Sequence, residues 1–186
     1  PNLGLVEFNG SKRNNIVWSE RGESLTPFRD ANPSCTPDAR YKAVVPHKGA
    51  LMALKSPDGI HWLPVRQEPV ITNGAFDSQN LAFWDTAKGE YRAYFRHFRK
   101  ANGRTYRDIL TATSQDFLNW TEAVWLQYPG SPDEELYTNQ IDRYHRAPHI
   151  FFGFPTRYID RNWSESMRML PDLEGREARA RNSRRE

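Results

Sequence analysis

The stretch SPDGIHW (residues 56–62) reappears 58 residues later as SQDFLNW (residues 114–120), with serine, aspartate and tryptophan at the same three places. In a tight turn, aspartate carboxylates and serine hydroxyls accept hydrogen bonds from nearby backbone N–H groups. A tryptophan directly after such a turn buries a large apolar surface. The repeat therefore predicts two equivalent turns, each followed by a packed tryptophan, that serve the scaffold and do no chemistry.

Strand-like segments surround the two turns at matching places. The first unit has the segments 15–18, 41–45, 51–54 and 69–71, and the second has 80–84, 91–95, 109–113 and 123–126. Residues 91–95 alternate in period two, as a half-buried strand does. Each unit of about 60 residues therefore contains four short strands, which is the pattern of a β-propeller blade.

The number of units does not complete a ring. Residues 3–8 match the last strand of an earlier unit, and residues 140–141 open a later one. We expect an all-β fold over residues 1–160, a partial five-bladed β-propeller with about two complete four-stranded blades and parts of two others. Because a propeller typically has at least four blades, we expect a piece of a longer protein or self-association through open sheet edges.

Residues 161–186 differ from the rest in composition. They hold seven of the chain's 26 basic residues and five of its 23 acidic ones, so the body before them is nearly neutral. Ser164 is placed to cap a short helix, and Pro171 interrupts it. We expect a charged, partly helical insertion or tail here.

Composition excludes several classes of protein. The near-neutral body argues against a nucleic-acid binder, and the longest apolar run is too short to span a membrane. Cys35 is the single cysteine, so no intrachain disulfide forms. The histidines His97, His145 and His149 lack the tight spacing of a metal site, and we expect no metal and no cofactor. The start Pro-Asn-Leu-Gly suggests a truncated N-terminus, which leaves the localisation open.

The Ser-x-Asp-x-x-x-Trp turn before a last strand resembles the five-bladed β-propeller glycosidases, the clan of glycoside hydrolase families 43 and 32. Two further segments are similar to that group: residues 76–85, FDSQNLAFWD, and residues 134–139, EELYTN. Each precedes or opens an innermost strand, where those enzymes place acidic residues. The resemblance covers roughly residues 1–160 and implies hydrolysis of a glycosidic bond by paired carboxylates.

Carried over to this sequence, the resemblance implies particular roles. Asp77 matches the aspartate that stabilises the transition state, and Glu135, or its neighbour Glu134, matches the general acid. We expect Arg96, Asn80, Asn139 and Arg157 to bind the carbohydrate substrate. Asp30 is a weaker candidate, because it follows the opening strand of its unit and therefore lies at the opposite rim.

One departure leaves other functions open. The first unit opens with Lys12-Arg13-Asn14-Asn15, which has no carboxylate where the family pattern places the nucleophile or base. That residue belongs to a missing blade, or the catalytic set differs, or the protein is no hydrolase. The alternatives are a non-catalytic propeller that binds carbohydrate or protein, and a blade fragment that associates with itself.

Overall fold

The chain is predominantly β, with two four-stranded antiparallel sheets. The computed structural model describes residues 3–19, 24–159 and 163–182. The first sheet has the order β1-β2-β3-β4, formed by Thr26–Arg29, Tyr41–His47, Ala50–Ser56 and Leu63–Pro64. The second has the order β5-β6-β7-β8, formed by Leu81–Asp85, Glu90–Ala101, Arg104–Ser114 and Val124–Trp125. A 3-10 turn, Pro37–Ala39, precedes β2.

A third hairpin follows the second sheet and is interrupted in the middle. Its outer part pairs β9 (Glu135–Leu136) with β12 (Arg157–Tyr158), and its inner part pairs β10 (Asp142–Tyr144) with β11 (Ala147–Phe152). Between the two parts, the Tyr137 N–H donates to the Thr156 carbonyl at 2.7 Å. Residues 135–158 therefore form the first two strands of a third unit.

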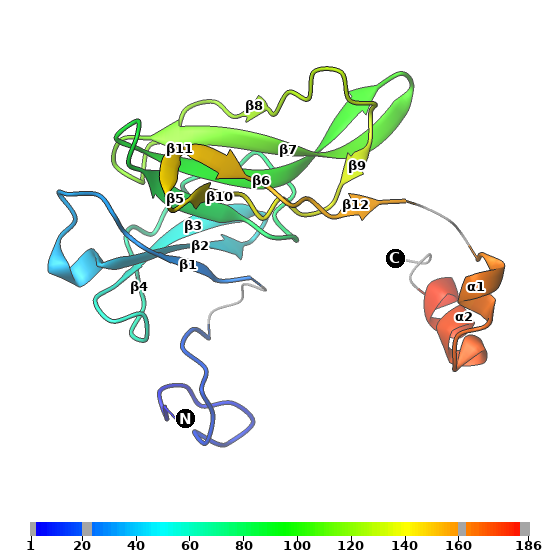
Figure 1. The fold of residues 1–186 in the computed structure, drawn as a ribbon. Helices are drawn as coiled ribbons and strands as arrows, with labels where there is room; N and C mark the ends of the chain where they lie inside the picture. The colour runs from blue at the N-terminus through cyan, green and yellow to red at the C-terminus, as the bar shows by residue number, and fades with distance from the viewer. Residues whose placement is uncertain (1–2, 20–23, 160–162, 183–186) are drawn as a thin grey trace.

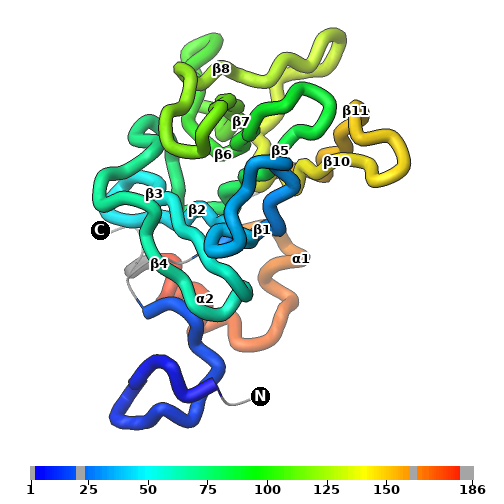
Figure 2. The backbone as a smooth tube through the Cα atoms, turned by 90° about the vertical axis from the view of Figure 1, so that its left-hand side faces the viewer, coloured from blue at the N-terminus to red at the C-terminus, as the bar shows by residue number. Residues whose placement is uncertain are grey.

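The two sheets lie next to each other and share a core. Strand β1 of the first sheet runs beside β5 of the second, and the β10–β11 hairpin lies on the other side of β5 (Figure 1, Figure 2). The main core holds residues from both sheets: Val44, Leu51 and Ala53 from the first, and Ala82, Trp84, Tyr91, Phe95 and Leu110 from the second. The two sheets therefore pack against each other through one shared core.

The all-β expectation is confirmed, and so are the sheet strands that include residues 41–45, 51–54, 81–84, 91–95, 109–113 and 124–125. The prediction for the opening strand of the first unit was wrong. Residues 15–18 form no strand, and β1 at Thr26–Arg29 takes that place by pairing with β2. Residues 3–8 form no regular strand either; Phe8 makes one isolated bridge with Ser11.

The predicted closing strand of the first unit is partly right. Strand β4 pairs with Leu54 and Lys55. The chain then leaves the sheet and returns at Ile71, which forms an isolated bridge with Leu51. Residues 69–71 thus contact the expected neighbour, but β4 takes the regular part of the pairing.

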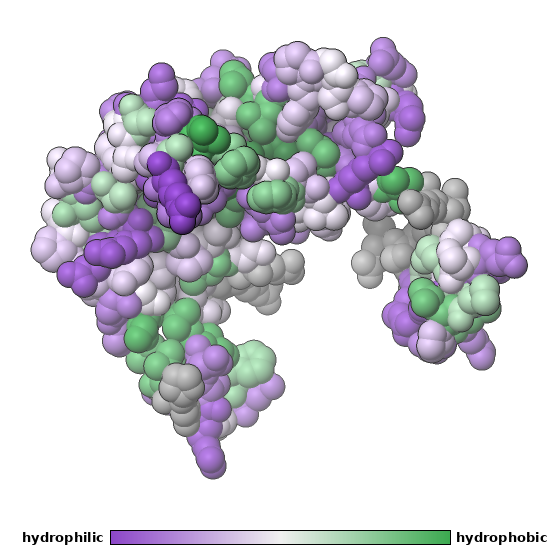
Figure 3. All heavy atoms as spheres, in the orientation of Figure 1, coloured by the Kyte–Doolittle hydropathy of each residue, from purple (hydrophilic) through white to green (hydrophobic). Residues whose placement is uncertain are grey.

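The ends of the chain lie outside the two sheets. Residues 3–19 lead away from β1 and expose apolar side chains such as Leu5 and Phe8 (Figure 3). Helices α1 (Glu165–Arg168) and α2 (Leu173–Asn182) lie apart from the sheets in Figure 1. Ser164 caps α1, because its hydroxyl accepts a hydrogen bond from the Met167 N–H. No helix in the described ranges is both long and apolar enough to cross a bilayer.

Candidate functional site

The two repeated turns use their carboxylates internally. Asp58 Oδ1 accepts from the N–H groups of Ile60 and His61, both at 2.8 Å, and these bonds lower the pKa of Asp58. Asp116 Oδ1 accepts in the same way from Leu118 at 2.9 Å and Asn119 at 2.7 Å. With their acceptor atoms engaged in the backbone, both aspartates hold turns.

The loop before β5 is bonded to the break in the third hairpin. Ser78 Oγ donates to the Tyr137 carbonyl at 2.9 Å, and Asn139 Nδ2 donates to the Gln79 carbonyl at 3.3 Å. The Gln140 N–H donates to Gln79 Oε1 at 3.2 Å. Residues about 60 positions apart in the sequence therefore meet between the loop before β5 and the break in the third hairpin.

Asp77 lies in that loop and is held by Arg96 of β6. The Arg96 side chain is 2% exposed and donates to the Asp77 carboxylate, whereas the Asp77 side chain is 68% exposed. The Arg96 guanidinium lies over the rings of Phe98 and Tyr137, 5.4 and 4.9 Å from their centroids. A buried guanidinium packed against two rings has one favoured position. It therefore presents the exposed Asp77 carboxylate in a defined place.

Glu135 opens β9 and is held by Arg107 of β7. Its Oε2 accepts from Arg107 Nη1 at 2.5 Å and from the Arg107 backbone N–H at 3.4 Å. The Arg107 guanidinium lies 4.2 Å from the Tyr158 ring centroid and 6.0 Å from that of Tyr137. The two tyrosine rings stack, with centroids 6.4 Å apart.

Tyr137 thus contacts both the arginine that holds Asp77 and the arginine that holds Glu135. We call this group the Tyr137 cluster, formed by Asp77, Arg96, Arg107, Glu135, Tyr137 and Tyr158. Sugar-binding sites commonly combine aromatic faces with a few fixed polar groups. The cluster has both, and it carries two carboxylates from different units.

The other predicted site residues lie around this cluster in different roles. Arg157 is exposed and forms an ion pair with Glu134, the alternative acid. Asn80 and Asn139 are buried: Asn80 Nδ2 donates to the carbonyls of Phe76 and Ser78, and Asn139 Nδ2 to those of Gln79 and Tyr94. Both amide side chains therefore lie beneath the loops and hold their backbone.

Asp30, the weaker candidate, lies in a buried polar network between the two sheets. Its carboxylate pairs with Lys42 and accepts from the Tyr91 hydroxyl at 2.7 Å. Burial and the bond to Asp30 raise the pKa of Tyr91. Burial lowers the pKa of Lys42, but the bonds to Asp30 and Tyr91 outweigh it and raise the value. Asp30 joins the sheets and is far from being an open carboxylate.

The position of β1 also changes which residues precede the first sheet. Glu20 and Glu23 come shortly before β1, in place of residues 12–15. Both glutamates fall outside the described residues.

Sequence reasoning missed Arg107, Tyr137, Tyr158 and Phe98. Alternation along the β6–β7 hairpin puts Arg96, Phe98 and Arg107 on one face, because Phe98 pairs with Arg107. That signal was present in the sequence, but it needed the register of the hairpin. Within residues 3–19, 24–159 and 163–182, no three His, Cys, Asp or Glu side chains gather as a metal site does. A comparison with family models and curated proteins finds no match to the chain.

Proposed function

We propose that this chain forms part of a five-bladed β-propeller of the glycoside hydrolase family 43 and 32 type, and that the Tyr137 cluster binds and cleaves a carbohydrate. One observation carries the proposal: Asp77 and Glu135, carboxylates from two successive units, each pair with an arginine whose guanidinium lies near the ring of Tyr137. Two carboxylates at a polar and aromatic surface are the groups that glycoside hydrolysis requires.

In this proposal each residue has a stated task. Glu135 donates a proton to the leaving glycosidic oxygen, and Asp77 stabilises the charge that develops on the sugar ring. Arg96 fixes Asp77, and the exposed edges of Tyr137 and Tyr158 pack against the sugar. The nucleophile or base is a third carboxylate outside the cluster.

A specific observation favours a second candidate, non-catalytic carbohydrate binding. A general acid must carry a proton at the start of the reaction. Glu135 instead accepts two hydrogen bonds from Arg107, and Asp77 is paired with Arg96. Carboxylates held in this way are well suited to accept hydrogen bonds from sugar hydroxyls without any transfer of a proton to the substrate.

Hydrolysis and binding assays separate the two candidates. The unsubstituted chain, Asp77→Asn and Glu135→Gln are tested against a panel of aryl glycosides and oligosaccharides, with Asp142→Asn as a control on the exposed surface of β10. We expect each site variant to reduce kcat about 10²–10³-fold, while the control keeps full activity. Binding that responds to Asp77→Asn without any hydrolysis would establish the second candidate. Neither hydrolysis nor binding would reject both.

A further inference from the structure

A cavity of about 660 Å³ lies between the β6–β7 hairpin and the segment that joins β8 to β9. This volume is within the range of pockets that hold small ligands. Its charged and aromatic lining residues are Arg99, Asp108, Trp125, Tyr128, Asp133 and Glu134. None of them belongs to the Tyr137 cluster.

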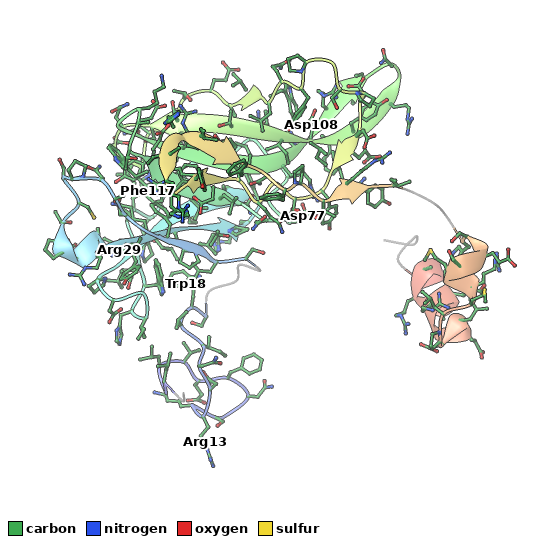
Figure 4. All side chains as sticks on the ribbon, in the orientation of Figure 1. Arg13, Trp18, Arg29, Asp77, Asp108 and Phe117 are labelled. Carbon is green, nitrogen blue, oxygen red and sulfur yellow. The ribbon has the colours of Figure 1, made fainter. Side chains whose placement is uncertain are left out.

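Strand alternation separates this cavity from the Tyr137 cluster. On β7, Asp108 lines the cavity, whereas its neighbour Arg107 binds Glu135. Around β9, Glu134 and Leu136 line the cavity, whereas Glu135 faces Arg107. Figure 4 shows Asp108 at the β6–β7 hairpin and Asp77 below it. The cavity and the Tyr137 cluster are therefore formed by the same strands, but by side chains on opposite faces of them.

The polar lining is fixed and carries more negative than positive charge. Arg99 Nε donates to Asp108 Oδ2 at 2.7 Å, and Arg99 Nη2 donates to Asp133 Oδ1 at 2.8 Å. Asp108 is buried and its Oδ1 accepts from the Ile109 N–H. One guanidinium thus lies between two carboxylates, while Glu134 pairs with Arg157. This arrangement repels anions and offers both donors and acceptors to a ligand.

The remaining lining is aromatic and apolar. The Trp125 ring stacks on His97, with centroids 6.1 Å apart and an angle of 13° between the planes, so its orientation is fixed. Burial, together with the nearby charge of Asp108, raises the pKa of Tyr128 to about 12. A tyrosine hydroxyl is protonated at neutral pH, so Tyr128 can donate a hydrogen bond. Pro129, Pro132 and Pro155 complete the wall.

We infer that this cavity is a second binding site, for a short neutral oligosaccharide. Sugar hydroxyls match the carboxylates of Asp108 and Asp133 and the donors of Arg99 and Tyr128, while the Trp125 ring packs against a sugar face. A wholly apolar ligand would leave these polar groups without partners. The site does not depend on hydrolysis at the Tyr137 cluster.

Calorimetric titration of the whole chain tests this inference. The probes are neutral trisaccharides of glucose, xylose, mannose and galactose, with trigalacturonate as the anionic probe and a glucosamine trimer as the cationic one. We expect at least one neutral probe to bind, the anionic probe to bind more weakly, and the cationic probe to bind at least as tightly as its neutral counterpart. Asp133→Ala and Tyr128→Phe should each weaken that binding about tenfold, whereas Asp142→Asn, outside both sites, leaves it unchanged.

The variants also distinguish the two sites. Asp133 is partly exposed and its side chain bonds to Arg99, so Asp133→Ala should fold normally, which circular dichroism verifies. Binding that responds to Asp77→Asn but not to Asp133→Ala or Tyr128→Phe would overturn this inference and leave the proposed function standing. Tighter binding of the anionic probe, or no binding of any neutral probe, would also overturn it.

Discussion

The turns at residues 56–62 and 114–120 have the same hydrogen bonds but different residues after the aspartate. Gly59 and Phe117 occupy the same place, and both have positive φ angles, 78° and 69°. Glycine adopts this conformation without strain, whereas phenylalanine does not. In both turns the tryptophan Nε1 donates at 3.1 Å to the carbonyl of this residue. The backbone geometry is therefore the same with or without a side chain there.

The difference lies in what each turn packs against. The Phe117 ring is 1% exposed and lies among Phe28, Tyr91 and Trp120, in the core between the two sheets. Trp62 packs on the other face of the first sheet, where Val17 and Trp18 cover it. The second turn packs into the core between the two sheets, whereas the first turn is covered only by the segment that contains Val17 and Trp18. The local sequence thus determines the conformation of the turn. The element that packs against the turn determines whether a side chain at the positive-φ position contributes enough packing to offset its backbone strain.

The largest effect is expected from Phe117→Ala. The substitution removes a buried ring and should lower the free energy of unfolding by about 3–5 kcal/mol. Urea denaturation followed by tryptophan fluorescence measures it. Leu63→Ala, at an exposed position in β4, is the control and should change stability little. A loss below about 1 kcal/mol for Phe117→Ala would mean that the ring does not tie the sheets together.

Asp116→Asn should have the next largest effect, about 1 kcal/mol at pH 7. Burial raises the pKa of Asp116, but hydrogen bonds from Asn119 and Leu118 outweigh it and lower the value to about 2. Because the folded pKa is below the usual value of about 3.9, the stabilisation is present above pH 4 and is lost as the pH falls towards 2.

The urea midpoints of the unsubstituted chain and Asp116→Asn should therefore differ at pH 7 and approach each other between about pH 4 and pH 2. Asp58→Asn should behave in the same direction, because the pKa of Asp58 is also lowered. A difference that stays constant with pH would show that the Asp116 carboxylate charge contributes nothing to the turn.

At the positive-φ positions 59 and 117, glycine should give a more stable protein than alanine, which reverses their usual order. Gly59→Ala should lower the free energy of unfolding by about 1 kcal/mol, because the backbone is left-handed at this position. No steric clash adds to this loss, since the new Cβ would lie 3.8 Å from the Tyr41 ring. Phe117→Gly should be more stable than Phe117→Ala by a similar amount. Denaturation midpoints of the four proteins test both statements, and a more stable alanine at either position would contradict them.

The smallest effect is expected from exchanging the residues that hold the outer carboxylate oxygen. His61 Nδ1 lies 2.7 Å from Asp58 Oδ2, and Asn119 Nδ2 lies 2.6 Å from Asp116 Oδ2. Both contacts are exposed to solvent. His61→Asn and Asn119→His should leave the thermal midpoint almost unchanged, and His61→Ala should lower it slightly. A large change in either exchange would show that the two turns are less alike than their hydrogen bonds indicate.

Much of the fold was predictable because the repeated turn sets a unit length. Strands β2, β3 and β5 to β8 follow from alternation and from their distance to Trp62 or Trp120. Strand β1 was not predicted, since Pro27 lies inside it and proline argues against a central strand. The apolar residues of 15–18 drew the assignment instead, although they cover Trp62 from outside the sheet.

The site was predictable only in part. The sequence pointed to Asp77, Arg96 and Glu135 as separate positions. Their meeting around Tyr137 depends on how far the β6–β7 hairpin extends beyond β5 and on the break in the third hairpin. The sequence pattern of an amide before a strand is the same whether the side chain contacts a ligand or the backbone. The sequence alone therefore predicted substrate contacts for Asn80 and Asn139. Burial decides between these roles, and the local sequence does not encode it.

The proline in β1 also bears on association between chains. The Asp30 N–H donates to the Arg40 carbonyl, so the N–H groups of Phe28 and Asp30 point to β2, and the nitrogen of Pro27 points to the open edge. A strand that approached the open edge of β1 would meet no backbone N–H donor at Pro27, inside β1. Pro27 thus protects the first sheet from growing by edge-to-edge pairing at the centre of the molecule, and it directs any added strand to the edges of β4 or β8.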